Sequence, residues 1–187
     1  MTEWKWKIGE SIERLRTRYD HIGRKTAAPF LAMVYPCAVE RAFVQEWRSQ
    51  VAGLAPEVEA QSLDLLEVTQ AVVAEFGVDA VVQSLVEPMP GSNAEAELAG
   101  LWLRAIADRV RSLFAAAHRG KPVVWLENCA ALYPACGPRD VMQALWDAPH
   151  EALQGPVVVL IPGTLEEART YRFLDQRREL MYRGDLL

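Results

Sequence analysis

The stretch VVVLIPGT, from Val157 to Thr164, is an apolar run that stops at a proline and a glycine. A short run with so few polar residues is typical of a strand buried on both faces, as in a parallel sheet. PFLAMVYP, from Pro29 to Pro36, and the apolar part of KPVVWLENC, from Pro122 to Leu126, have the same character. These three runs predict the centre of an α/β fold.

The segments between these strands repeat their apolar residues every three or four positions, which indicates helices. Strands that alternate with helices pair in parallel through right-handed crossovers. We therefore predict a three-layer α/β domain with a mostly parallel sheet over residues 1–187. It comprises an amphipathic helix within 1–25 and a sheet-and-helix core over 29–187. Helices are expected at Ile8–Tyr19, Ala38–Val51, Ala71–Phe76, Val78–Val86, from Asn93 to near Gly120, and at Arg139–Trp146.

Shorter segments complete the predicted order. Leu63–Val68 reads as another strand, Thr170–Leu174 as a turn of helix and Leu180–Tyr182 as a last edge strand. Ser92 or Asn93 is expected to cap the long helix, because either side-chain oxygen can accept from an unpaired backbone amide. Large aromatic residues at apolar positions are expected in the core: Phe30, Trp47, Trp102, Trp125 and Trp146.

Composition excludes several classes of protein. The formal net charge of −5 disfavours direct nucleic-acid binding, which needs a basic surface to displace counterions. No apolar run approaches the roughly 18 residues of a membrane span, and the amino terminus is charged throughout. Three cysteines at irregular spacing argue against a disulfide framework. A cytoplasmic protein without membrane attachment is expected.

The segment after the first strand lacks the motif of a phosphate-binding loop. That loop needs G-x-x-x-x-G-K-S/T, in which glycines let backbone amides wrap the phosphates and the lysine neutralises charge. After Tyr35 the chain reads Pro36 and then Cys37 to Arg41, with no glycine before Gly53, and G-x-G-x-x-G is also missing. The pattern predicts a fold that resembles a degenerate P-loop NTPase without phosphate-binding motifs, and no cofactor.

Glu127 ends the third strand in VVWLEN, where an ATPase would place an acidic residue to position magnesium or water. The same residue can equally serve as a helix cap or as an ion-pair partner. Both interpretations stay open at this point, with the structural one preferred.

Other catalytic chemistry has weaker support. Cys37 and Cys129 each follow a strand and Cys136 is in a nearby loop, but buried cysteine usually acts as a small apolar filler. No C-x-x-C occurs, and neither His118 nor His150 is spaced as a zinc ligand with the cysteines. No serine has the flanking glycines of a nucleophile elbow, although His150 could serve as a late base. No metal site or catalytic set is predicted.

YRFLDQRREL, from Tyr171 to Leu180, places three arginines beside two acidic residues. The composition predicts a solvated face on which Arg172, Arg177 and Arg178 pair with Asp175 and Glu179. A nucleic-acid stripe is the alternative.

The last third of the chain resembles the BrxB family of bacteriophage exclusion (BREX) defence systems. The resemblance rests on LYPACGPRDVMQALWDAP, GPVVVLIPGT, YRFLD and MYRG. Two features depart from the family pattern: Ile161 replaces an aromatic residue, and the loop before Arg139 carries Cys-Gly-Pro. The matching residues are Leu132, Tyr133, Pro134, Arg139, Leu145, Gly155, Pro162, Gly163, Thr164, Arg172, Phe173, Leu174, Tyr182 and Arg183.

The resemblance implies a non-catalytic component of a multiprotein antiviral system that includes a PglZ-like phosphatase-fold protein, a large ATPase and a DNA methyltransferase. Its implied role is an adaptor that bridges the PglZ-like protein and the ATPase, with homo-oligomerisation open. The alternative is a nucleotide-binding hydrolase or transferase that uses Glu127 with an atypical loop. Trp4 and Trp6 precede the first helix as a core staple or a partner-binding anchor. Candidate partner-binding residues are Trp4, Trp6, Tyr133, Pro134, Arg139, Pro162, Gly163 and Thr164.

Overall fold

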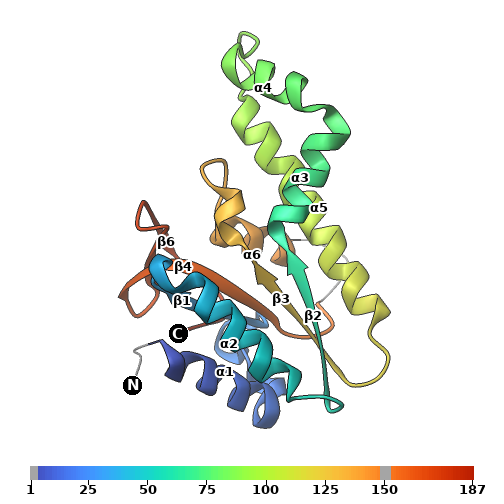
Figure 1. Cartoon of the computed structure of the whole chain (residues 1–187), viewed down its shortest axis with the longest axis vertical. Coiled ribbons are helices and arrows are strands. Elements are labelled where there is room, and N and C mark those ends of the chain that lie inside the picture. The colour runs from blue at the N-terminus through green and yellow to red at the C-terminus, as the bar shows by residue number, and fades with distance from the viewer. Residues whose placement is uncertain (1–3, 148–152) are drawn as a thin grey trace.

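A mostly parallel sheet lies at the centre of the protein in the computed structural model, which describes residues 4–147 and 153–187 (Figure 1). Its main strands follow the order β2-β3-β4-β1-β7, and every neighbouring pair along this order is parallel. Two further strands extend the sheet from β4 in antiparallel pairing. The strands are β1 (Phe30–Tyr35), β2 (Val58–Asp64), β3 (Lys121–Glu127), β4 (Val157–Glu167), β5 (Thr170–Phe173), β6 (Arg177–Leu180) and β7 (Asp185–Leu186).

Helices cover both faces of the sheet, which confirms the predicted α/β class and the three layers. Alternate side chains of each buried strand point to opposite faces, so one strand supplies two separate cores. One core lies under α1 (Lys5–Thr17) and α2 (Glu40–Ala52), and the other under α3 (Leu65–Phe76), α5 (Ala94–Ala116) and α6 (Pro138–Trp146). Short 3-10 turns connect the elements: η1 (Tyr19–His21), η2 (Arg24–Thr26), η3 (Cys37–Val39) and η4 (Cys129–Leu132).

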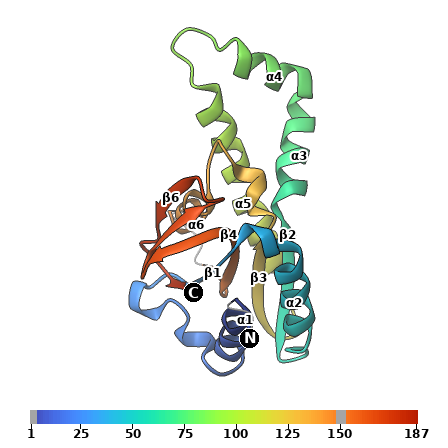
Figure 2. The same cartoon turned by 60° about the vertical axis from the view of Figure 1, so that its left-hand side comes forward.

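Helices α3 and α5 project well beyond the sheet and carry α4 (Val78–Val86) at their far end (Figures 1 and 2). Gly77, between α3 and α4, has a φ of +87°, a backbone conformation that favours glycine. Asn93 begins α5 because its Oδ1 accepts from the amide of Ala96 at 3.1 Å, so the expected cap is confirmed. In the two described ranges, no helix combines the length and the apolar character needed to cross a membrane.

The predicted strand at Leu63–Val68 is wrong in its position. The strand β2 ends at Asp64, and α3 begins at the next residue. The Asp64 carboxylate accepts from the amides of Leu66, at 2.8 Å, and Glu67, at 3.4 Å, and so starts the helix. This aspartate within an apolar run was the missed signal.

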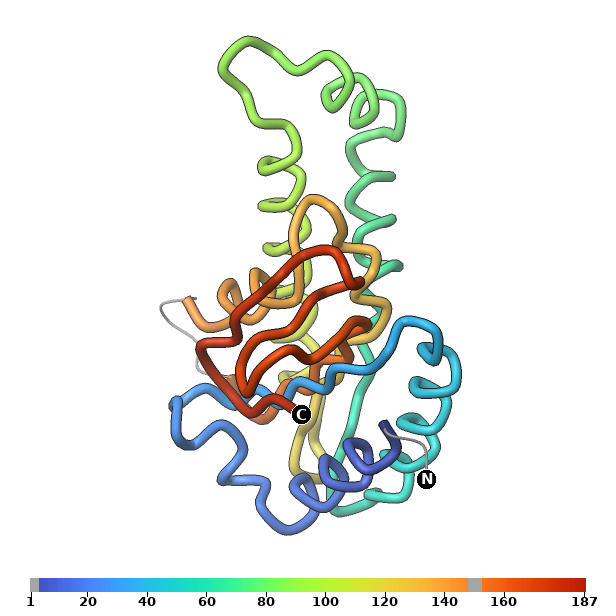
Figure 3. Tube along the Cα trace, turned by 90° about the vertical axis from the view of Figure 1, so that its left-hand side faces the viewer, coloured from blue at the N-terminus to red at the C-terminus, as the bar shows by residue number. Residues whose placement is uncertain are grey.

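The carboxyl-terminal segment also differs from the prediction. Strand β4 does not stop at Pro162 and Gly163 but continues to Glu167, and residues 170–173 pair with it as β5 rather than forming a helical turn. The expected edge strand at 180–182 lies earlier, as β6. We call β4, β5 and β6 from Pro162 to Leu180 the hairpin; Figure 3 shows its red trace beside the orange segment of α6.

Most of the large aromatic residues are in the core, as predicted. Phe30, Trp47, Trp102 and Trp125 are buried, whereas Trp146 is only half-buried. Trp47 and Trp125 pack edge to face with ring centroids 6.5 Å apart. This contact links α2 to β3, beside the end of the sheet where the candidate site lies.

We expect Gly163→Ala to lower the free energy of unfolding by roughly 1–3 kcal/mol, because Gly163 has a φ of +152° and a Cβ there would overlap the Arg172 carbonyl oxygen. Gly100→Ala in α5 is the matched control: its Cβ meets nothing within 4 Å, and an alanine should stabilise the helix by about 0.5–1 kcal/mol. Urea unfolding of both variants measures the difference; equal stabilities would contradict the close approach of β5.

Candidate functional site

The carboxyl end of β1 leads into a closed turn. The chain leaves β1 through Tyr35 and Pro36 into η3, and the amide of Val39 donates to the Pro36 carbonyl at 3.0 Å. A phosphate cradle requires successive amides that face outward and a backbone that bends as glycine does. The residues at this exit offer neither a glycine nor a lysine.

Glu127 is held in place by two side chains at the end of β3. Its carboxylate is 4% exposed, and its Oε2 accepts from Arg48 Nε at 3.1 Å and from Trp125 Nε1 at 3.2 Å. A second guanidinium nitrogen of Arg48 pairs with Oε1, which makes the contact bidentate. The hydrogen bonds that Arg48 donates to Glu127 raise the pKa of Arg48. The interpretation of Glu127 as an ion-pair partner is confirmed.

An open groove of about 520 Å³ lies beside this ion pair. Arg48 lies within it, 56% exposed, so the partner of the buried carboxylate is reachable from solvent. A carboxylate in the same wall, Glu40, accepts from the Tyr35 hydroxyl at 3.2 Å. This mixture of charges suits a polar protein surface better than a triphosphate, which Glu40 would repel. The groove is lined by Glu40, Arg41, Val44, Gln45, Arg48 and Asn128.

The three cysteines are poorly placed for nucleophilic chemistry. Burial raises the pKa of Cys37, Cys129 and Cys136, in the last case to about 12, and the charge of Asp175 adds to the effect at Cys37. Because only the thiolate is a nucleophile, thiols with such pKa values are unreactive at neutral pH. His150 lies outside the described residues. Among those that are described, no three His, Cys, Asp or Glu side chains gather in a way that could hold a metal ion.

A second buried carboxylate, Glu179, joins the hairpin to α6. Its side chain is 2% exposed, and Oε2 accepts from the Tyr171 hydroxyl at 2.6 Å and from the Arg139 amide at 3.0 Å. The Arg139 amide is an unpaired backbone donor at the amino terminus of α6, so the Glu179 oxygen caps this helix. Arg177 Nε lies 3.2 Å from Oε1 but is not aligned for a hydrogen bond. Burial is the main cause that raises the pKa of Glu179.

The predicted pairing within the arginine-rich segment is confirmed for Arg177 and Glu179, whose Nε and Oε1 lie 3.2 Å apart, and is wrong for Arg172 and Arg178. Glu179 is buried rather than solvated, and Asp175 accepts from Thr164 Oγ1 at 2.7 Å. Arg172 and Arg178 instead clamp Glu166, with contacts of 2.7 and 3.0 Å, and lower its pKa. The sequence could not place Glu166 opposite them, because that contact depends on the extension of β4 past Gly163.

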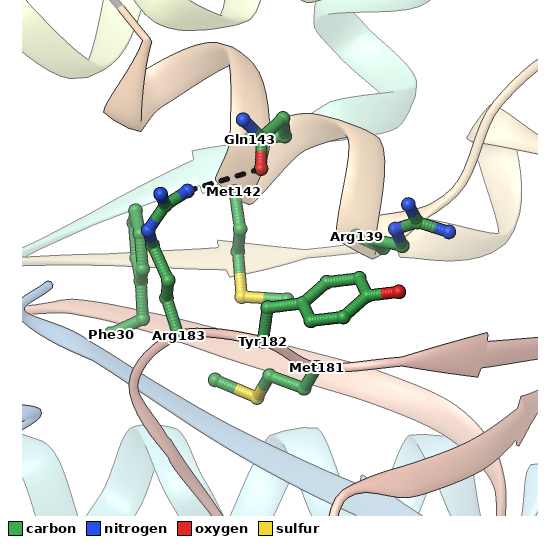
Figure 4. A pocket seen from close by; sticks show the side chains of 7 residues that line it. All are labelled: Phe30, Arg139, Met142, Gln143, Met181, Tyr182 and Arg183. Atoms are coloured by element: carbon green, nitrogen blue, oxygen red, sulfur yellow. Dashed lines mark hydrogen bonds between the residues drawn. The ribbon is translucent and has the colours of Figure 1, made fainter. Parts of the chain in front are cut away.

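Side chains of α6 pack against those of residues 181–183, which follow β6 (Figure 4). The Arg139 guanidinium lies 5.2 Å from the centroid of the Tyr182 ring, and that of Arg183 lies 5.1 Å from the Trp146 ring. Arg183 Nη1 also donates to Gln143 Oε1 at 3.3 Å. These distances are typical of cation–π contacts. A cavity of about 20 Å³ between the side chains shows that they nearly fill the space.

Tyr133 adds to this surface from the loop after η4. Its ring packs edge-on against the buried Phe173 of the hairpin, with centroids 6.5 Å apart, while 43% of the residue is exposed. We call the exposed residues Tyr133, Pro134, Arg139 and Tyr182 the α6–hairpin face. Its members come from two segments that lie far apart in the sequence and meet through Glu179 and Phe173.

The structure divides the other predicted site residues into buried and exposed ones. Trp4 packs against Phe43 at 5.4 Å in the core under α1, so the staple interpretation describes it, whereas Trp6 is 51% exposed. Pro162 and Gly163 are buried at the hairpin, and the neighbouring Thr164 is exposed. Trp6 belongs to α1, and α6 covers the opposite face of the sheet, so the candidate residues do not form one surface.

Sequence reasoning missed Arg48, which shapes the site, and it named Glu179 only as part of a solvated face, whereas the residue is buried. A buried carboxylate at a strand end needs a partner, so Glu127 signalled that a cation must lie nearby but could not say which one. Glu179 lies between the exposed Arg178 and the half-buried Leu180 in RREL, and this pattern does not predict an inward-facing glutamate.

Comparisons with known proteins do not assign the chain to a family. No model of a known protein family matches the chain, and no curated protein matches it.

We expect Glu127→Gln to lower the free energy of unfolding by about 1–3 kcal/mol, because it removes a charged, nearly buried hydrogen-bond acceptor. A double-mutant cycle with Arg48→Met in urea should give a coupling of about 0.5–3 kcal/mol. The exposed Glu13→Gln is the control and should change stability by less than about 0.5 kcal/mol. A coupling near zero would show that the ion pair does not contribute.

Glu179 should make stability fall as the pH rises above 4.5, its ordinary pKa. Between that value and the raised pKa of the folded state, the folded chain keeps a proton that the unfolded chain has lost. Glu179→Gln should remove this slope in unfolding measurements from about pH 5 to 8. The control is Glu166→Gln. The pKa of Glu166 is lowered, so this residue changes the pH dependence of stability only below this pH range. A slope unchanged in Glu179→Gln would contradict the raised pKa.

Proposed function

We propose that this protein is a non-catalytic adaptor of a BREX-type antiphage defence system. It bridges a PglZ-like phosphatase-fold protein and a large ATPase in the cytoplasm, where its three cysteines stay free. The observation that carries the proposal is the α6–hairpin face. Four of the residues that underlie the resemblance to BrxB are exposed there, although they are spread over some fifty positions of the sequence: Arg139 stacks on Tyr182, and Tyr133, beside Pro134, packs on Phe173 of the hairpin.

The contacts behind this face support a role in binding. Arg139 and Tyr182 are exposed and stack on each other, and the backbone of Arg139 is fixed by Glu179. A surface of aromatic and arginine side chains on a rigid base is typical of the energetic centre of a protein–protein interface. Exposed rings and guanidinium groups held in this way lose little conformational entropy when a partner binds.

The carboxyl ends of β1 and β3, where a P-loop protein would bind its nucleotide, support the non-catalytic part of the proposal. Strand β1 lies between the parallel strands β4 and β7 and is followed by a helix, as in a P-loop scaffold. Its exit contains no glycine and no lysine, and the carboxylate that would position magnesium or water is engaged by Arg48. We therefore interpret the scaffold as a degenerate P-loop fold that has kept its shape as a platform for partners.

The exposure of Arg48 beside Glu127 is the observation that favours the rival function, a nucleotide hydrolase or transferase. For that function Arg48 would have to release the carboxylate and bind phosphate itself, which its exposure would allow. Such an enzyme would bind ATP or GTP in calorimetry, and Glu127→Gln would abolish turnover. A heat of nucleotide binding together with that loss would contradict the adaptor proposal.

When the chain is co-expressed with the PglZ-like protein and the large ATPase encoded beside it, we expect both to co-purify with it. The double variant Arg139→Glu and Tyr182→Ala should reduce the recovered partner roughly tenfold, as for an interface side chain that contributes more than about 1 kcal/mol. Quantitative pull-down measures this ratio.

Arg109→Glu is the matched control, because Arg109 is exposed on α5 and is not a residue of the α6–hairpin face. It makes the same charge change and should leave the recovery unchanged. A chain that purifies alone, or a double variant that recovers as much partner as Arg109→Glu, would rule out the α6–hairpin face as the adaptor surface.

A further inference from the structure

Helix α4 and its neighbouring turns form the far end of the helical projection (Figures 1 and 2), and this end exposes many large apolar side chains. Seven of the eleven exposed large apolar side chains in the described ranges lie between residues 66 and 89. Contiguous exposed apolar surface of this kind marks interaction sites in soluble proteins. We call the following residues the arm tip: Phe76, Val78, Val82, Leu85, Val86 and Met89.

Helix α4 presents these side chains as a stripe. Val78, Val82 and Leu85 are separated by four and three positions, so they lie along one side of the helix. They are 59%, 52% and 42% exposed, and no residue of α4 is buried. Val81 packs against the core and attaches the helix to the projection. The stripe therefore faces solvent on a helix that is already anchored, which is the geometry for pairing with a second helix.

The charge around this stripe has a single sign. Residues 65–103 contain six acidic residues and no lysine, arginine or histidine, whereas the formal net charge of the whole chain is −5. Residues 65–103 thus have a formal charge of −6, which exceeds the net charge of the whole chain. The acidic residues are Glu67, Glu75, Asp79, Glu87, Glu95 and Glu97.

The negative charge restricts which kinds of partner can bind to the arm tip. Two arm tips facing each other would bring like charges together, and an anionic membrane would repel the tip in the same way. The basic helix α1 of a second copy does not fit either, because its apolar residues Ile8, Ile12 and Leu15 are already buried in its own core. A helix with an exposed apolar stripe flanked by lysine or arginine matches both the stripe and the charge.

We propose that the arm tip is a docking surface for a basic amphipathic helix of a protein partner. The apolar side chains of that helix pack along Val78, Val82 and Leu85, and its cations lie near Asp79 and Glu87. The inference rests on the proposed role as an interaction module, but not on the identity of the partner. It adds a second binding surface, separate from the α6–hairpin face.

The test uses the full chain and a fluorescein-labelled leucine/lysine peptide of about 18 residues with an amphipathic helical pattern. Fluorescence anisotropy should show this peptide binding at least about tenfold more tightly than its leucine/glutamate counterpart. It should also bind more tightly than a scrambled peptide of identical composition that lacks the stripe. A rise in salt from about 50 to 300 mM should weaken binding severalfold.

Variants of the chain distinguish the contribution of apolar packing to peptide binding from that of charge. Leu85→Asp should weaken binding of the basic peptide about tenfold, although the added negative charge alone would strengthen it. Leu165→Asp is the matched control, because Leu165 in the hairpin is 40% exposed, close to the 42% of Leu85; it should bind as the wild type does. The double reversal Asp79→Lys and Glu87→Lys should invert the preference between the basic and acidic peptides.

Equal binding of the ordered and scrambled peptides, or equal loss in Leu85→Asp and Leu165→Asp, would overturn the proposal. A dimer in analytical ultracentrifugation that Leu85→Asp dissociates would assign the surface to a second copy instead, and flotation with lipid vesicles that depends on Leu85 would assign it to a membrane. These results are distinguishable from a failure of the adaptor assignment, because the peptide experiment does not involve the BREX proteins and leaves Arg139 and Tyr182 unchanged.

Discussion

The pairing of β1 with β4 is the constraint on which the rest of the fold depends. The register places Phe30 opposite Val157 and Tyr35 opposite Pro162, so two apolar strands are buried side by side along their whole common length. Each strand then supplies apolar side chains to both faces, and helices on both sides are needed to cover them. The same register brings the exit of β1 next to the point at which β4 leaves the parallel sheet. The candidate site and the hairpin both begin there.

Two buried carboxylates show how this edge is stabilised. Glu127 is bound by a guanidinium that reaches solvent, so its charge is compensated at the surface of the groove. Glu179, a buried residue of β6 in the hairpin, accepts hydrogen bonds from a hydroxyl and a backbone amide. Its burial is the main cause that raises its pKa. Burial of a carboxylate is costly unless hydrogen bonds replace its water, so each glutamate requires its neighbours to hold their positions. Glu179 therefore fixes α6 against the hairpin, and that position exposes Arg139 beside Tyr182.

The sequence was sufficient where a pattern was long and consistent. The buried strands predicted within 29–36, 122–126 and 157–164, the cap at Asn93 and the helices α4 and α5 follow from local chemistry, and the structure confirms that they are present. It was insufficient where a contact between distant segments decides the conformation. Residues 170–173 have no strong strand pattern, and they form β5 because β4 extends far enough to pair with them. The partners of Glu127 and Glu166 are likewise set by the topology, and no spacing rule places Arg48 or Arg172 beside them.

The exposed apolar stripe of α4 and the α6–hairpin face differ in what they can recognise. The first combines aliphatic side chains with negative charge, and the second combines aromatic rings with the positive charge of Arg139. Helices α5 and α6 both cover the same face of the sheet, so both surfaces lie on that side of the molecule, at different distances from the sheet. A protein that contacts two partners at once needs surfaces that are separate in space and selective in charge, because overlap or equal chemistry would make the partners compete. The arm tip, with its acidic residues, and the α6–hairpin face, with Arg139, meet both requirements within one chain of 187 residues.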